Sequence, residues 1–372
     1  MQQTKEKNFK TLLEIFNEEL QQLPFKITFD KIESFITADK KSAEFINTIN
    51  FGDNTLFENL EYKKISQCRA RHSAISFLMG IAIGKFKNIL NKCSTVLTYD
   101  INCLQLNKKD INYRLWMVTS INHDYGYYSN YLSKKINISD LNISYYLLND
   151  ESNLDYIPLT NYSEKYKHVL KNNYDQIIAY YEYSQRYHEK NQDSEEKNDH
   201  GILGALLVYD RVLRHSLIKE KIGCDMYDIL LYKTACLTIA QHNIFKSNSK
   251  DTDKLYGEKL AHLYHDSNYM IDNNYVLLYL LSIVDTLECV KTFSKSENQT
   301  NYFETVTILK NVEIDVTDDC ITINFSNLYE KINNDKPELL NKIDKHIENI
   351  KGLAKWTDLK VQETEDKVLE IK

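Results

Sequence analysis

Apolar residues recur at helical spacing along most of the chain, and this pattern predicts a mainly α-helical protein. The first helix is expected over residues 8–23, where Phe9, Leu12 and Phe16 share one face, and it ends before Pro24. The nearly continuous apolar run at 273–293 predicts a central core helix. The same spacing predicts further helices over residues 68–90, 112–123, 160–190, 200–219 and 226–244.

The pattern changes after residue 293. A polar linker at 294–301 precedes two segments, VEIDV and CITINF, that alternate with period two around Thr317-Asp318-Asp319, which is typical of a β-hairpin. A helix over 337–352 and a terminal pair of strands, in LKVQET and KVLEI, are expected to follow. We therefore predict an all-α domain at 1–293, with its core at 68–293, and a small α+β appendage at 302–372.

Composition narrows the class of protein. A net charge of −7 argues against broad electrostatic binding of nucleic acid, because phosphate backbones are held mainly by clustered lysine and arginine. The seven cysteines form no CxxC pair, so reduced thiols are expected. The chain has no run of about 18 apolar residues and no signal-peptide pattern, so we expect a cytoplasmic protein that does not enter a membrane.

Polar residues that interrupt the apolar helices are the candidates for chemistry. His72 begins one helix, His123 and Asp124 end another, and His242 continues the apolar face of a third. Asp285 lies in the most hydrophobic helix, where an isolated carboxylate would be expensive to bury. A bound metal ion would offset that cost, since imidazole and carboxylate are common metal ligands.

The order of a histidine, a His-Asp doublet and a late aspartate resembles the HD-domain superfamily of metal-dependent phosphohydrolases, from about Cys68 to Phe293. The resemblance implies an HD-type helical bundle in which His72, His123, Asp124 and Asp285 bind one divalent ion. The segments NDHGILGALLVYDRVL and IAQHN look like the family's additional histidine segments. They imply a second ion at His200 and His242, bridged by Asp124.

The resemblance implies a divalent-metal-dependent phosphohydrolase that cleaves a nucleotide or a phosphodiester bond with a metal-activated water. His123 and Asp124 would form the catalytic centre, holding one or two ions of Mn, Fe, Co, Ni, Zn or Mg. We expect a nucleotide or a short single-stranded nucleic acid as substrate, because the chain is acidic and has no basic run.

The residues after the doublet depart from the family. Many relatives continue with glycine and lysine, whereas this chain has Tyr125, Gly126 and Tyr127, and it has no acidic pair of the alarmone hydrolase kind. No subfamily is assigned. Two alternatives stay open: an HD-type single-strand nuclease, and a catalytically silent HD-fold nucleotide sensor or scaffold.

Several other residues are weaker candidates. Substrate contacts are predicted for Arg69, Arg71, Tyr127, Arg211 and Arg214, although the arginines are also consistent with carboxylate pairing and the tyrosine with loop packing. A second doublet, His265-Asp266, is interpreted as a solvated turn, and His346 as a surface residue along with His168, His188, His215 and His262. The C-terminal appendage has no catalytic pattern, so we expect it to bind a protein partner or a second copy of the chain.

Overall fold

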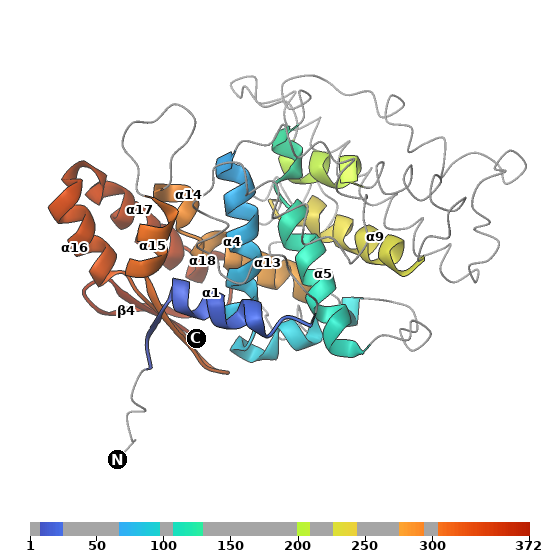
Figure 1. Ribbon diagram of the computed structural model, residues 1–372, viewed down its shortest axis with the longest axis horizontal. Helices are drawn as coiled ribbons and strands as arrows, with labels where there is room; N and C mark the ends of the chain where they lie inside the picture. The colour runs from blue at the N-terminus through green and yellow to red at the C-terminus, as the bar shows by residue number, and fades with distance from the viewer. Residues whose placement is uncertain are drawn as a thin grey trace, which may run out of the picture.

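The computed structural model describes residues 8–24, 67–96, 107–128, 199–208, 226–243, 275–293 and 304–372. Within these ranges the chain is mostly helical, and its one sheet is small, antiparallel and built largely from C-terminal residues (Figure 1). The prediction of a mainly α protein with strands near the C-terminus is therefore confirmed. The helix predicted over 160–190 lies outside the described residues.

Among the described residues, four helices pack together at the centre of the chain. Helix α5 packs against both α4 and α9, and α13 contacts all three of these helices. Figure 1 shows α4 and α5 side by side. Trp116, Tyr279 and Phe77 are fully buried among them, and burying side chains of this size contributes strongly to stability. The four helices are α4 (Gln67–Ile83), α5 (Lys108–Asn122), α9 (Met226–Gln241) and α13 (Val276–Leu287).

The apolar run at 273–293 forms two helices, where the pattern predicted one. Every side chain of α13 from Val276 to Asp285 is buried, which confirms a central position. The backbone of Glu288 is extended, with φ −65° and ψ 112°, and α14 (Val290–Phe293) begins two residues later. The Glu288 carboxylate accepts hydrogen bonds from the backbone N–H groups of Val290 and Lys291, so this side chain caps the second helix at the break.

The helix predicted over 68–90 is also shorter than expected, because α4 ends at Ile83. Lys87 and Asn88 have φ values of 49° and 54°, which an α-helix does not accommodate, and two 3₁₀ helices follow, Phe86–Asn88 and Leu90–Val96. Among the described residues no single helix is long and apolar enough to cross a membrane. In this described part, the segments Arg71–Ile83 and Phe86–Thr95 taken together are long and apolar enough, but a bend of 103° separates them.

Helices α4 and α5 approach closely at Gly80. The Trp116 indole donates a hydrogen bond to the Phe77 carbonyl at 2.8 Å, and a Cβ atom at Gly80 would overlap the indole ring. Gly80→Ala is therefore expected to lower the free energy of unfolding by about 1–3 kcal/mol, as overpacking of a core does, even though alanine favours the helix itself. Urea denaturation measures this loss.

A double-mutant cycle tests the cause of that loss. In a Trp116→Leu background the indole is absent, so adding Gly80→Ala should cost much less than it costs in the wild-type chain. An equal cost in both backgrounds would show that the contact with Trp116 is not responsible.

The sheet has the strand order β1-β2-β3-β5-β4, and each neighbouring pair is antiparallel. The predicted hairpin and the predicted terminal strands are both confirmed. The edge strand β1 comes from the N-terminal segment, where a helix was predicted to begin; α1 starts instead at Leu12, behind a capping box between Thr11 and Glu14. The strands are β1 (Lys10–Thr11), β2 (Glu313–Val316), β3 (Ile321–Asn324), β4 (Val361–Glu365) and β5 (Val368–Ile371), and α1 is Leu12–Gln21.

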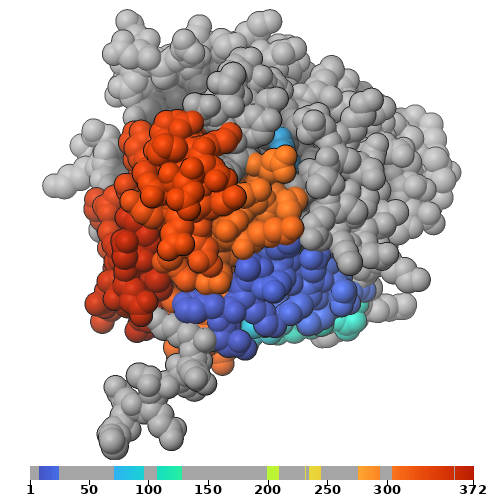
Figure 2. Space-filling model, turned by 60° about the vertical axis from the view of Figure 1, so that its left-hand side comes forward, coloured from blue at the N-terminus to red at the C-terminus, as the bar shows by residue number. Residues whose placement is uncertain are grey.

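Helices accompany this sheet. The predicted helix over 337–352 begins with a 3₁₀ turn and continues as α17, and two helices that the pattern did not predict, α15 and α16, flank the hairpin. Figure 2 shows the N-terminal segment in blue lying against the C-terminal residues in orange and red. The elements are α15 (Thr305–Asn311), α16 (Ser326–Asp335), the 3₁₀ helix Pro337–Leu339, α17 (Leu340–Lys351) and α18 (Leu353–Trp356).

The prediction that His346 lies at the surface is wrong. Its side chain is buried in α17, where its ring lies against Phe293 and Phe325 and it hydrogen-bonds the carbonyl of Leu287. Burial lowers the pKa of His346 to about 4, so the ring is neutral at pH 7. The C-terminal helices are thereby joined to the junction between α13 and α14.

Candidate metal centre

The six residues predicted as metal ligands lie together among the core helices. His72 lies in α4, His123 and Asp124 follow the last residue of α5, and His242 follows the last residue of α9. His200 opens the helical residues 200–208, and Asp285 lies in the last turn of α13. All six are buried except His200, whose side chain is 13% exposed.

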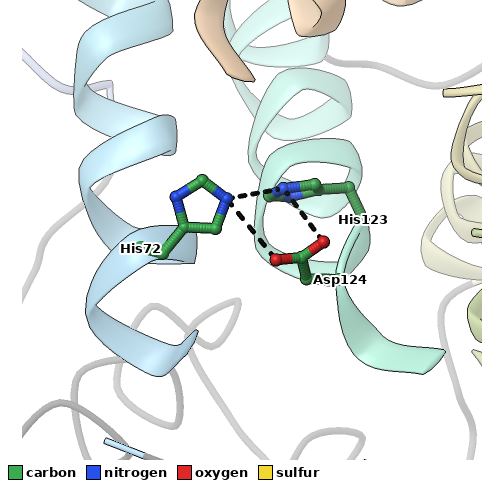
Figure 3. Close-up of side chains that lie close together, drawn as sticks. All are labelled: His72, His123 and Asp124. Atoms are coloured by element: carbon green, nitrogen blue, oxygen red, sulfur yellow. Dashed lines mark hydrogen bonds and ion pairs between the residues drawn. The ribbon is translucent and has the colours of Figure 1, made fainter. Parts of the chain in front are cut away.

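Four of these residues surround one position. His72 Nε2 lies 3.1 Å from His123 Nε2 and 3.5 Å from Asp124 Oδ2, while His123 Nε2 lies 3.6 Å from Asp124 Oδ1. Figure 3 shows the two rings directed toward each other from neighbouring helices, with the carboxylate beside them. Asp285 Oδ1 is a fourth possible ligand atom, and it lies 3.4 Å from His72 Nε2 and 3.9 Å from His123 Nε2. The two histidines and Asp124 could hold a divalent ion between them.

Asp124 also belongs to a second group. Its Oδ1 atom lies 3.5 Å from His200 Nε2 and 3.9 Å from His242 Nε2, so these three side chains form another possible site. The Asp124 carboxylate therefore faces both groups, with Oδ2 toward His72 and Oδ1 toward the other histidines. A carboxylate in this position is suited to bridge two ions.

The hydrogen bonds of three histidines determine which ring nitrogen has a lone pair available to bind a metal ion. His123 Nδ1 lies 2.6 Å from the Ser120 carbonyl oxygen, and His242 Nδ1 lies 2.7 Å from that of Ile239. A carbonyl oxygen only accepts, so each Nδ1 carries a hydrogen and, in the neutral ring, each Nε2 carries a lone pair. His72 Nδ1 is held in the same way by the Glu288 carboxylate, at 2.6 Å. All three Nε2 atoms thus point into the cluster.

The surroundings set the charge of these groups. Burial opposes ionisation of Asp124, but His123, His200 and His72 hold its pKa well below the usual range. Burial lowers the pKa of His123 to about 4. Burial, together with His200 and His123, holds the pKa of His242 well below its usual value. At pH 7 Asp124 is therefore charged and both rings are neutral, which are the protonation states that metal binding requires.

His72 differs from the other two rings. Burial and the nearby Lys291 act to lower its pKa, but contacts with Asp285 and Glu288 outweigh them, so its pKa is raised. Without a metal ion, a proton on His72 Nε2 accounts for its short distance to His123 Nε2. A metal ion at this position would replace that proton.

Two residues near the cluster were missed by sequence reasoning. Glu288 is completely buried and contacts His72, and Lys291 places its Nζ atom 2.5 Å from Asp285 Oδ1 and 2.8 Å from the Asp285 carbonyl oxygen. A signal was present, because Asp285, Glu288 and Lys291 follow one another at intervals of three residues after a nearly continuous apolar stretch. Lys291 therefore places a positive charge beside Asp285.

The residues after the doublet pack against His200. The ring of Tyr127 stacks on the imidazole, with centroids 3.9 Å apart and an interplanar angle of 26°. A Cβ atom at Gly126 would overlap the His200 carbonyl oxygen, so glycine permits this close approach. Asn243 Nδ2 lies 2.7 Å from His200 Nε2 and 3.0 Å from Nδ1, so the amide can donate to either nitrogen. Hydrogen bonds therefore constrain the orientation of the His200 ring less than they constrain the other three rings.

The structure describes only some of the remaining predicted residues. Arg71 is partly buried in α4, one residue before His72, and Tyr125 is buried. Arg211, Arg214 and the side chain of Arg69 lie outside the described residues, as does the second doublet, His265-Asp266. Among the described residues, no disulfide bond is formed by Cys93, Cys236, Cys289 or Cys320.

The chain was compared with family models, with curated proteins and with solved structures. No family model, curated protein or solved structure matches this chain. The assignment of the cluster therefore depends on its residues and their geometry, which together define a buried histidine-aspartate cluster able to hold a metal ion.

Proposed function

We propose that this chain is a divalent-metal-dependent phosphohydrolase of the HD type, which cleaves a nucleotide or a phosphodiester bond with an activated water. The order of the six residues along the chain supports the HD-type bundle, and their proximity in space supports the metal centre. The substrate class follows from the kind of reaction that such a centre performs.

One observation carries the proposal: the Nε2 atoms of three buried histidines converge on the carboxylate of Asp124. Each of these rings is oriented by an acceptor at Nδ1, so the nitrogen that faces inward is Nε2, which carries the lone pair whenever the ring is neutral. Lone pairs of neutral rings repel one another at 3.1 Å unless a proton or a metal ion lies between them. An arrangement built only for stability has no need of three such rings around one carboxylate.

The residues divide into two ligand sets. His72, His123, Asp124 and Asp285 would hold one ion, and Asp124, His200 and His242 would hold a second. When bound, such ions activate water and neutralise phosphoryl oxygens. The ligand types suit Mn²⁺, Fe²⁺, Co²⁺, Ni²⁺ or Zn²⁺.

The chain's own residues would prepare the site for an anionic substrate. Burial of Asp124 and Asp285 excludes water from the cluster and strengthens the electrostatic interactions in it. Lys291 brings a positive charge beside Asp285, and Tyr127 brings an aromatic face beside His200 on which a base could stack. A nucleotide or a short single-stranded nucleic acid is the substrate we propose.

A second candidate function is a nucleotide sensor that binds metal without cleaving a substrate. Tyr127 favours it, because this ring covers one face of His200, a ligand of the second ion, at 3.9 Å. If Tyr127 blocks the second site, the chain would bind a single ion and could not use two ions to hydrolyse a substrate.

Metal removal tests the proposed function. The full chain is expected to contain one or two divalent ions and to hydrolyse at least one member of a panel of nucleotides, phosphodiesters and short oligonucleotides. Treatment with EDTA should abolish this activity and added Mn²⁺ should restore it, whereas EDTA already saturated with Mn²⁺ should have no effect.

The possible outcomes separate the candidates. Hydrolysis that survives metal removal would contradict the proposal. Tight metal binding with no turnover across the panel would favour the sensor. A steep decrease of oligonucleotide affinity with rising salt would favour the nuclease alternative, because phosphate contacts release counterions.

A further inference from the structure

Glu288 is a fully buried carboxylate that belongs to neither ligand set. Burying a charged carboxylate is costly unless hydrogen bonds compensate it. Its Oε2 atom lies 2.6 Å from His72 Nδ1 and 3.2 Å from the backbone nitrogen of Lys291, and its Oε1 atom lies 2.5 Å from the backbone nitrogen of Val290. The carboxylate is therefore satisfied on both oxygens, and His72 is its side-chain partner among these contacts.

The contact with Glu288 fixes the orientation of the His72 ring. A charged carboxylate only accepts hydrogen bonds, so Nδ1 of His72 carries a hydrogen and donates it. The opposite nitrogen, Nε2, then faces His123 and the two aspartates at distances of 3.1–3.5 Å. Rotating the ring by half a turn would lose the bond to Glu288 and turn a carbon atom toward the cluster.

Glu288 is itself held in place by the backbone. It lies between α13 and α14, and the two N–H groups that bind it belong to the first residues of α14. Asp285, one helical turn earlier in the chain, reaches the same cluster. The junction thus supplies a ligand for the metal position and an orienting group for a ligand that comes from α4.

The C-terminal helices support this junction from the other side. His346 of α17 hydrogen-bonds the carbonyl of Leu287, the residue before Glu288, and its ring packs against Phe293 at the end of α14. Helices α13 and α14 both contact α17. The position of Glu288 is therefore set by packing and not only by its own hydrogen bonds.

We propose that Glu288 is the positioning residue of the metal centre: it holds the His72 ring so that Nε2 presents a lone pair to the ion, and it ties that ring to the segment that carries Asp285. Histidine ligands of metals are commonly oriented by a carboxylate in this way, and loss of the carboxylate weakens metal binding. The inference rests on the metal centre of the proposed function, but it does not depend on hydrolysis.

Zn²⁺ binding to the full chain tests this role. Glu288→Gln keeps the size of the side chain, but its amide N–H₂ group would face either the N–H of Val290, or the N–H of Lys291 together with Nδ1–H of His72. We expect Glu288→Gln to bind Zn²⁺ about 10–100-fold more weakly than the wild-type chain in a calorimetric titration. Glu19→Gln is the matched control, because Glu19 is also buried but lies in α1, and its affinity for Zn²⁺ should equal that of the wild type.

A spectroscopic measurement tests the same role without a substitution at Glu288. In Zn²⁺-loaded, ¹⁵N-histidine-labelled wild-type protein, His72 should be protonated at Nδ1 and bound through Nε2, as seen in long-range ¹H–¹⁵N correlation spectra and assigned by the loss of its signals in His72→Gln. This result stands even if Glu288→Gln fails to fold.

The outcomes are distinct. A folded Glu288→Gln variant with wild-type affinity for Zn²⁺, or a His72 ring bound through Nδ1, would overturn the positioning role. A wild-type chain that binds no Zn²⁺ would overturn both this role and the metal centre. A wild-type chain that binds Zn²⁺ through the six residues but hydrolyses nothing would overturn the proposed hydrolysis alone and leave the role of Glu288 in place.

Discussion

Asp124→Asn is expected to abolish binding of divalent metal and, with it, all hydrolysis of phosphoesters. Asp124 is the residue common to both ligand sets, and its two oxygens face four histidines at distances of 3.5–3.9 Å. Asparagine has the same shape, but it lacks the negative charge and turns an N–H₂ group toward one set of Nε2 atoms. Metal affinity should fall by more than about 100-fold, the upper end of the loss seen when only an outer-shell residue is removed.

Elemental analysis of the purified variant measures this effect, and activity on the substrate found for the wild type gives a second readout. Asp319→Asn is a suitable control, because Asp319 is exposed in the hairpin turn and should retain the wild-type metal content. A folded Asp124→Asn protein with undiminished metal content and turnover would refute the proposed function.

Gly126→Ala is expected to reduce the metal content from two ions to one and to lower hydrolysis by about 100-fold, the cost of displacing a catalytic group by about 1 Å. The added methyl group would overlap the backbone carbonyl of His200, so the helical residues 200–208 must move away. This movement separates His200 from Asp124 Oδ1, which lies 3.5 Å from its Nε2 atom. Two of the four ligands of the first ion, His72 and Asp285, come from other helices and should be unaffected.

Gly352→Ala provides the comparison for Gly126→Ala. It adds the same methyl group in the C-terminal part of the chain, where the nearest atom is the Asn349 carbonyl oxygen, and should leave the number of bound ions unchanged. Two tightly bound ions in Gly126→Ala, or one ion in the wild-type chain, would contradict the assignment of His200 to a second metal.

The six candidate ligands could be chosen from the sequence because of the cost of burying polar groups. Asp285 interrupts an apolar helix, and His123 and Asp124 end another, so each needs a partner whatever the details of packing. The structure places these residues within hydrogen-bonding or ion-pairing distance of one another. Their role as metal ligands and the reaction they serve remain predictions.

Glu288 and Lys291 could not be assigned in the same way. A glutamate and a lysine near the end of an apolar helix are ordinarily exposed, and only the break between α13 and α14 turns Glu288 toward His72. His346 shows a related failure. It lies among charged residues, but the apolar face formed by Ile343, Ile347 and Ile350 includes its position and is buried against the core.

The local pattern determined much about this protein from sequence alone: its helical class, the hairpin around Thr317, and which polar residues need partners. These features depend on residues a few positions apart. The tertiary structure decided the rest. The edge strand β1 forms because β2 lies beside it, the 3₁₀ turn after α4 is held where the Lys87 N–H donates to the Asp318 carbonyl, and the tautomer of His72 is set by a carboxylate 216 residues away. Such contacts bring together groups that no local pattern connects, and their energies depend on the packing of the whole chain.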